Sequence, residues 1–194
     1  MKKYIAECLG TFALTLVVAL SISGDFAVAT PVLAALTLGL FVYSIGHLSG
    51  VHINPAVTIG AWSIDKITTQ DAWRYVVAQF IGAAAALFLV SVTVGGTELL
   101  VSDKWPVALA ECLGTFFFTF GIASVIYGKT PGLMSGVVVG GSLLLGIAVA
   151  ALLGSNGVLN PAVALGIGSF SFIYLCAPIV GSVLGMQAYK YLSE

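Results

Sequence analysis

Two Asn-Pro-Ala triplets are the residues of this sequence best suited to handle a polar solute. They are Asn54-Pro55-Ala56 and Asn160-Pro161-Ala162. Asn followed by Pro favours a helix start, because the amide oxygen can accept a backbone N–H and proline at the first helical position gives up only a donor that had no partner. If each oxygen caps its own helix, the NH₂ group remains free to donate to a passing oxygen atom. Two such donors would orient a small polar molecule.

The segments that follow the triplets are too short to cross a membrane as helices. One of them is residues 55–64, which corresponds to about 15 Å at the usual rise per residue. The hydrocarbon core of a bilayer is about 30 Å thick. Two half-helices that enter from opposite faces and meet at their N-termini would fill one span and place Asn54 and Asn160 at its centre. Their positive dipole ends would disfavour cations there. This geometry predicts a pore.

Glycine-containing segments lead into both triplets, at Gly46 to Ile53 and at Gly154 to Leu159. We interpret them as non-helical backbone at membrane depth, which is tolerated only where it is buried in protein or lines a water-filled cavity. Their carbonyl groups would form a row of acceptors along one side of the lumen, opposite apolar helices. A lumen of this kind binds water or a small alcohol weakly enough to release it.

Three ionisable residues accompany the predicted pore. Glu7 and Glu111 lie in identical segments, AECLGTF, and a carboxyl group inside a membrane span is costly without a partner. As a proton relay the pair would indicate a transporter, whereas as buried acceptors for loop N–H groups they would support the loops. Their symmetric placement, one per loop, favours the supporting role. His52 is expected to line the cytoplasmic approach to the pore.

The elements that hold these residues follow from an internal duplication. AECLGTF begins at Ala6 and again at Ala110, so the chain contains two copies of one unit, at about 1–100 and 105–194. Each copy has three apolar runs near the length of a membrane span and one half-helix. The runs are Tyr4 to Ser23, Pro31 to Ile45, Ala72 to Val94, Pro106 to Tyr127, Pro131 to Leu153 and Phe170 to Leu192. The prolines at 31, 106 and 131 are expected at the starts of helices.

The odd number of spans per copy sets the fold class. The second copy must enter the membrane from the side opposite to the first, which makes an inverted repeat with its working site at the repeat interface. We therefore predict an all-α membrane protein with six transmembrane helices and two re-entrant half-helices. The predicted unit is a single channel domain, residues 1–194.

Composition excludes several other classes. Hydrophobic residues make up 59% of the chain, charged residues 8%, and the mean hydropathy is +1.10, which is typical of an integral membrane protein. Lys2-Lys3 is too small a basic cluster for a nucleic-acid surface. The three cysteines lie in apolar stretches and indicate neither a disulfide framework nor a metal site. The sequence contains no nucleophile–base pair or phosphate loop, so we expect no enzyme and no cofactor.

The distribution of basic residues predicts the orientation in an inner or plasma membrane. If the N-terminus is cytoplasmic, the predicted topology leaves only Lys104 outside. The basic residues on the cytoplasmic side would be Lys2, Lys3, Lys66, Arg74, Lys129 and Lys190. Such an excess follows the positive-inside rule, and both termini are then cytoplasmic.

These motifs resemble the aquaporin and aquaglyceroporin family, the major intrinsic proteins. The resemblance covers essentially the whole chain and rests on the two AECLGTF segments, GHLSGVHINPAVTIG, YVVAQFIGA, GVLNPAV and IYLCAPIVG. It implies six tilted helices with two half-helices, a homotetramer in the lipid bilayer with one pore per subunit, and passive conduction of water or small neutral solutes. A proton-coupled secondary transporter and a structural protein with a closed pore are the alternatives.

One position departs from the family pattern. Most members have an arginine directly after the second triplet, as part of an outer selectivity filter, and this sequence has Val163. Matching by spacing implies that Ala34, Ala148 and Gly157 are the other filter positions. Such a small, uncharged set would widen the outer constriction. The resemblance therefore leaves open a channel for glycerol, urea or undissociated metalloid acids such as arsenicals.

Overall fold

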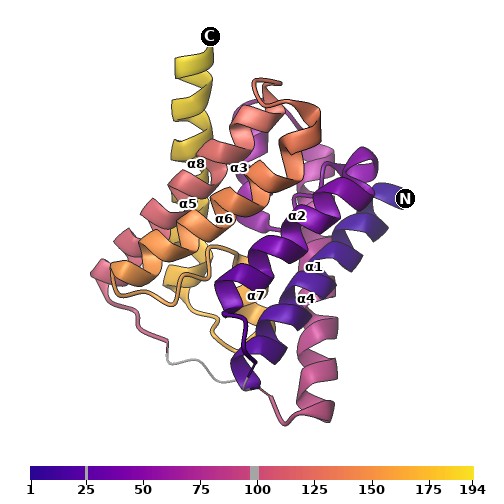
Figure 1. The fold of residues 1–194 in the computed structure, drawn as a ribbon, viewed down its shortest axis with the longest axis vertical. Helices are drawn as coiled ribbons and strands as arrows, with labels where there is room; N and C mark the ends of the chain where they lie inside the picture. The colour runs from indigo at the N-terminus through magenta and orange to yellow at the C-terminus, as the bar shows by residue number, and fades with distance from the viewer. Residues whose placement is uncertain (25, 97–100) are drawn as a thin grey trace.

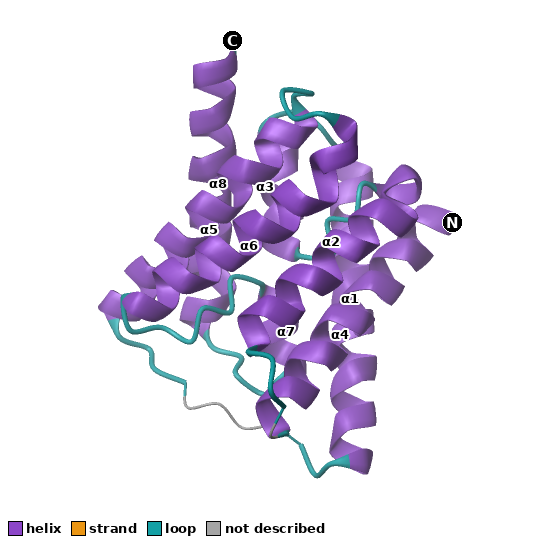
Figure 2. Cartoon of the chain, in the orientation of Figure 1, coloured by secondary structure: helices purple, strands orange, loops and turns teal. Residues whose placement is uncertain are grey.

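The computed structural model describes residues 1–24, 26–96 and 101–194. These residues form helices joined by turns and loops, as Figure 2 shows. Six helices in the described part of the chain are long and apolar enough to cross a membrane, α6 together with the turn before it. They are α1 (Lys2–Ser23), α2 (Thr30–Ser49), α4 (Thr69–Thr93), α5 (Trp105–Ile126), α6 (Ser135–Leu152) and α8 (Phe172–Ser193). Two short helices, α3 (Pro55–Ser63) and α7 (Pro161–Gly166), follow the two triplets. The predicted fold class is therefore confirmed.

The lead-in to α3 is shorter than the sequence predicted. Residues from Gly46 to Ser49 belong to α2, and the irregular backbone begins only at Gly50. Gly50 has a φ of 83° and its N–H bonds to the Gly46 carbonyl at 2.8 Å. A glycine in the left-handed conformation ends a helix in this way at no steric cost.

The expected helix start at Pro131 is also wrong. The N–H of Met134 bonds to the Pro131 carbonyl at 2.8 Å, and this three-residue spacing forms a 3₁₀ turn, η1 (Gly132–Met134). The α-helix begins one turn later, at Ser135. Short 3₁₀ turns are common at the N-termini of α-helices.

The two copies pack by equivalent contacts. α1 packs along α4, and α5 packs along α8. In the first pair Gly82 lies against the Cys8 carbonyl, and in the second Gly181 lies against the Cys112 carbonyl, so a β-carbon at either glycine would collide with backbone. Small residues allow membrane helices to approach this closely. Across the two copies, Gly39 of α2 meets the Gly136 carbonyl of α6 in the same manner.

Each half-helix packs against the last span of the other copy. α3 contacts α8, and α7 contacts α4. Gly60 of α3 lies against Ser182 and Met186 of α8, and Gly166 of α7 lies against the Ala83 carbonyl of α4. In Figure 1 the two half-helices lie toward opposite ends of the bundle. Each half-helix therefore ties its own copy to the other one.

Candidate functional site: a pore between the repeats

The two asparagines of the triplets cap their own half-helices. Asn54 Oδ1 accepts from the Ala56 N–H at 2.8 Å. Asn160 Oδ1 accepts from the N–H groups of Ala162 and Val163 at 3.0 and 3.3 Å. Both asparagines have extended backbone, with φ of −158° and −145°, and proline follows each of them. These are the helix starts that the sequence predicts.

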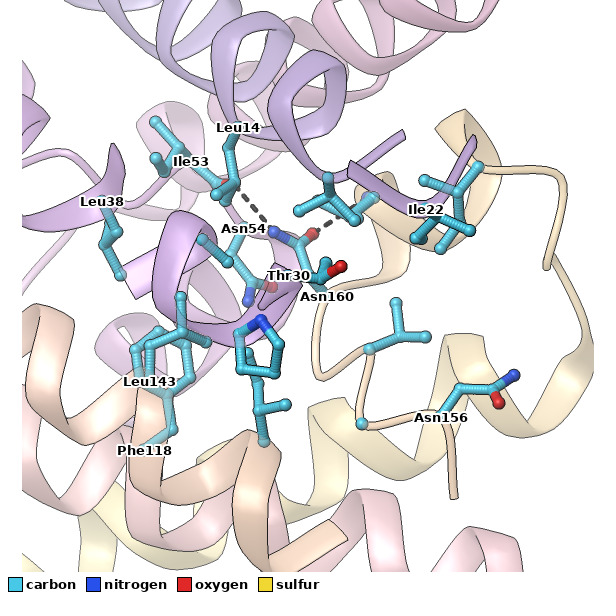
Figure 3. A pocket seen from close by; sticks show the side chains of 18 of the residues that line it. Leu14, Ile22, Thr30, Leu38, Ile53, Asn54, Phe118, Leu143, Asn156 and Asn160 are labelled. Atoms are coloured by element: carbon cyan, nitrogen blue, oxygen red, sulfur yellow. Dashed lines mark hydrogen bonds between the residues drawn. The ribbon is translucent and has the colours of Figure 1, made fainter. Parts of the chain in front are cut away.

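The remaining amide groups cross between the two copies. Asn54 Nδ2 donates to the Leu159 carbonyl at 2.9 Å, and Asn160 Nδ2 donates to the Ile53 carbonyl at 3.0 Å. Figure 3 shows the Asn160 amide directed at Ile53. The expectation that the whole NH₂ group is free is therefore wrong, because one of its two hydrogens holds the other loop. Among the described contacts, each amide makes one donor bond.

Strained backbone sets the direction of these carbonyl groups. Ile53 and Leu159, which precede the asparagines, have φ of 39° and 55°. Val51 and Gly157, two residues earlier in each copy, have φ of 52° and 66°. Branched residues rarely adopt positive φ, and such strain persists where the surrounding structure holds it.

Glu7 holds the first loop in this conformation. Its carboxylate accepts from the N–H groups of His52 and Ile53 at 2.9 and 2.6 Å. It also accepts from Ser49 Oγ at 2.7 Å and from Gln79 Nε2 at 2.8 Å. The side chain is fully buried. Because hydrogen bonds to a charged group are among the stronger ones, these contacts offset the strain of the loop.

Glu111 does the same for the second loop. It accepts from the N–H groups of Val158 and Leu159 at 3.0 and 2.8 Å, and from Ser155 Oγ. It too is fully buried. The two carboxylates thus occupy the supporting arrangement that their symmetric placement favoured.

The rest of the AECLGTF segment also serves the loops. A β-carbon at Gly10 would lie 2.5 Å from Ile53 Cγ2, and one at Gly114 would lie 2.8 Å from Leu159 Cδ2. The two glycines therefore make room for the side chains that precede the asparagines. The sequence repeats this segment because each copy has one strained loop to support.

The polar surroundings of the two loops differ on one point. Gln79 Nε2 also donates to Thr58 Oγ1 at 2.9 Å, and Thr58 Oγ1 lies 3.2 Å from His52 Nδ1. The equivalent positions in the second copy are Ala164 and Pro178. His52 also packs edge-on against Tyr75, with ring centroids 5.3 Å apart. His52 is thus held in a fixed orientation, and it lines the cavity described next.

A cavity of about 210 Å³ leads to the asparagines. Its polar lining comes from Thr30, His52, Asn54, Asn156 and Asn160. Its walls are apolar side chains from α1, α2, α5, α6 and α7: Leu14, Val18, Ile22, Pro31, Ala34, Leu38, Phe118, Leu143, Ile147 and Val163, with Val158 and Ile167 in the adjoining loops. It therefore has the apolar walls and small polar share expected of a lumen.

The four expected filter residues do not all reach this cavity. Ala34, Gly157 and Val163 line it. Ala148 does not line it, because it is exposed on the outer surface of α6, and its neighbour Ile147 lines the cavity instead. Consecutive residues of a helix point about 100° apart around its axis. An alignment error of one residue can therefore select a residue on the exposed face of the helix instead of the one that faces the cavity.

Sequence reasoning missed most of the wall residues, but for two of them the sequence held a signal. Leu14 and Phe118 each come seven residues after a buried glutamate, which is two helical turns and hence the same helix face. Since Glu7 and Glu111 face the loops, this spacing was a signal that Leu14 and Phe118 face the loops as well.

Comparisons with known proteins agree with this geometry. The family described as "Major intrinsic protein" matches residues 1–189. Aquaporin AqpM of Methanothermobacter thermautotrophicus is 30% identical, over all of this chain and 98% of that protein. Aquaporin NIP1-1 of Arabidopsis thaliana is 31% identical, over 98% of this chain and 73% of that protein. The structure of the aquaglyceroporin from Plasmodium falciparum has the same fold, with a TM-score of 0.77, 23% identity, and coverage of 99% of this chain and 96% of that one.

The family match extends over nearly the whole chain and includes both asparagine triplets, both loops, the first five spanning helices and most of α8. The chain belongs to the major intrinsic protein family, whose members are channels and not enzymes.

Proposed function

We propose that this protein is a passive transmembrane channel for water and small neutral solutes. The observation that carries the proposal is the pair Asn54 and Asn160, held at the repeat interface beside a cavity with apolar walls and few polar groups. Each amide has one hydrogen left for an oxygen atom of a solute. The apolar walls do not compete for that atom, so binding is weak enough for release.

Cations are disfavoured at the same place by the backbone. The N-termini of α3 and α7 both begin beside the asparagines, and each carries a partial positive charge. A positively charged residue at position 163 would raise the electrostatic barrier to cations, but this chain has the uncharged Val163 there. The two helix N-termini therefore supply a larger share of that barrier in this channel.

We further propose that the outer filter consists of Ala34, Ile147, Gly157 and Val163. None of these side chains is charged or donates a hydrogen bond. This composition favours solutes larger than water, such as glycerol, urea or undissociated metalloid acids including arsenicals. Ile147 is larger than the alanine expected from sequence, so the opening is narrower than the sequence alone implied.

The proton-coupled alternative finds no support in the described contacts. A relay requires a carboxylate that reaches the lumen, whereas Glu7 and Glu111 are both fully buried and bonded to backbone N–H groups. We therefore assign them to loop support.

The protein is an integral membrane protein, and we propose an orientation with both termini cytoplasmic. An even number of spanning helices brings both termini to the same side of the membrane. The excess of lysine and arginine on that side supports its assignment as the cytoplasmic side. We also propose a homotetramer with one pore per subunit, on the strength of the family resemblance.

The test is a permeability panel on purified protein in liposomes. Stopped-flow light scattering would measure water in a sucrose gradient and swelling in glycerol, urea and arsenite gradients. We expect water flux with a low activation energy, together with glycerol flux that neither saturates nor responds to a proton or sodium gradient. Solute flux that saturates and follows an ion gradient would favour a transporter instead.

A further inference from the structure

Four large apolar side chains lie around the middle of the cavity, and we refer to them as the central ring: Leu14, Leu38, Phe118 and Leu143. One comes from each of the first two spans of each copy, α1 and α2, then α5 and α6. Each is at most 5% exposed although it borders an open cavity.

The depth of the ring follows from helix geometry. Leu38 lies four residues beyond Ala34 in α2, and Leu143 lies four residues before Ile147 in α6. Because these helices run in opposite directions, both residues lie about 6 Å further inward than the outer filter. Leu14 and Phe118 lie two turns from the glutamates that hold the loops, again on antiparallel helices. All four positions converge on the level of the asparagines.

The outer filter is lined by smaller groups than the central ring. Of its four members, Ala34, Gly157 and Val163 have at most a branched three-carbon side chain, and only Ile147 is as large as a leucine. The ring contains three leucines and one phenylalanine. Figure 3 shows Leu38, Phe118 and Leu143 on the cavity wall that also holds Asn54. The side chains that border the lumen are therefore larger in total at the central ring than at the outer filter.

Phe118 is the member of the ring that breaks its symmetry. AECLGTF places Leu14 and Phe118 at the same position of the two copies. The phenylalanine begins close to α6, because a β-carbon at Gly146 would lie 3.1 Å from Phe118 Cβ. A flat aromatic ring is larger than the side chain of a leucine, so on one side of the lumen it excludes solutes that a leucine would let pass.

We propose that the central ring sets the size limit of this channel, and that Phe118 is its specificity-determining residue. This inference rests on the proposed function. It assigns the choice among neutral solutes to a residue outside the four positions of the outer filter. Solutes of increasing width are then discriminated beside the asparagines, where their hydrogen bonds are also made.

The inverted repeat supplies a matched experiment. Phe118→Leu, Leu14→Phe and the exchange variant that carries both substitutions would be reconstituted beside the unchanged protein. Water, glycerol, urea and erythritol would be measured by stopped-flow light scattering. We expect Phe118→Leu to raise erythritol and glycerol permeability about five-fold, with a smaller rise for water. Leu14→Phe should lower both solutes, and the exchange variant should return close to the original values, because the ring keeps its composition.

Two further variants keep the test decisive. Val163→Ala enlarges the outer filter, and its effect on erythritol should be several-fold smaller than that of Phe118→Leu. Phe118→Met also removes the aromatic ring but puts an unbranched side chain in its place. It would replace Phe118→Leu in the experiment if the leucine variant does not form a monodisperse species in detergent. A larger effect from Val163→Ala than from either substitution of Phe118, in protein that conducts water, would contradict the proposal that the central ring sets the size limit. The proposal that the protein is a channel would still stand. If the unchanged protein and all variants failed to conduct any of the four molecules, both proposals would be overturned.

Discussion

Asn54 donates its side-chain amide to the carbonyl of Leu159 at 2.9 Å, which ties the start of α3 to the loop that leads into α7. Asn160 returns the same bond to Ile53. Each asparagine therefore has two partners, the first turn of its own half-helix and the loop of the other copy. The relationship makes the two copies depend on one another at the centre of the pore.

Replacement of either asparagine should destabilise both loops. For Asn160→Ala we expect a loss of about 1–3 kcal/mol, because a helix cap and a buried hydrogen bond are removed together. Asn54→Ala should behave alike. The two effects should not add in the double variant, because the residues share one network. Thermal unfolding of detergent-solubilised protein measures this, and simple additivity would mean that the crossed bonds carry little energy.

Neutralisation of a buried carboxylate should cost stability without changing the transport mechanism. Glu111→Gln has only one acceptor oxygen to offer to the N–H groups of Val158 and Leu159, so we expect a loss of about 1.5–3 kcal/mol. The fraction that folds should still conduct water. An unfolding series in detergent together with a flux assay measures both. Normal stability with abolished, gradient-dependent uptake would instead identify a proton relay.

The glycine of the repeated segment should tolerate no side chain. In Gly114→Ala the new β-carbon would lie 2.5 Å from the Gly146 carbonyl oxygen and 2.8 Å from Leu159 Cδ2. Overpacking of this kind costs about 1–3 kcal/mol. Gly141→Ala is the matched control, since no atom lies within 4 Å of its β-carbon position. The comparison would be made by melting temperature, and equal values for the two variants would contradict the described packing.

A charge at the outer filter should restrict the larger solutes and strengthen the cation barrier. Val163→Arg places a guanidinium group at the cavity wall close to the N-terminus of α7. We expect glycerol and urea flux to fall by about ten-fold and water flux to fall less, with a lower proton leak because the positive potential rises. Liposome swelling and a pH-sensitive dye report the two effects. Val163→Leu controls for bulk, and an equal loss in both variants would assign the effect to size alone.

Much of the site could be predicted from local sequence. The Asn-Pro helix starts, the buried glutamates and the apolar spans depend on contiguous residues, and the structure contains all of them. The exact starts and ends of helices were less predictable. Pro131 precedes a 3₁₀ turn, and Gly46 lies inside α2. The local sequence allows several conformations at these helix ends, and the hydrogen bonds formed there determine which one is adopted.

The sequence by itself therefore determined the spans, the inverted repeat, the half-helices and the pair of asparagines. Hydropathy and helix capping depend on residues that are neighbours in the chain, and the internal repeat can be found by comparing the sequence with itself. Only the tertiary structure decided that Ile147 and not Ala148 faces the cavity, that each asparagine bonds the opposite loop, and that Phe118 belongs to the central ring. These features depend on the rotation of each helix about its axis and on contacts between residues more than a hundred positions apart. Packing of the whole bundle sets both.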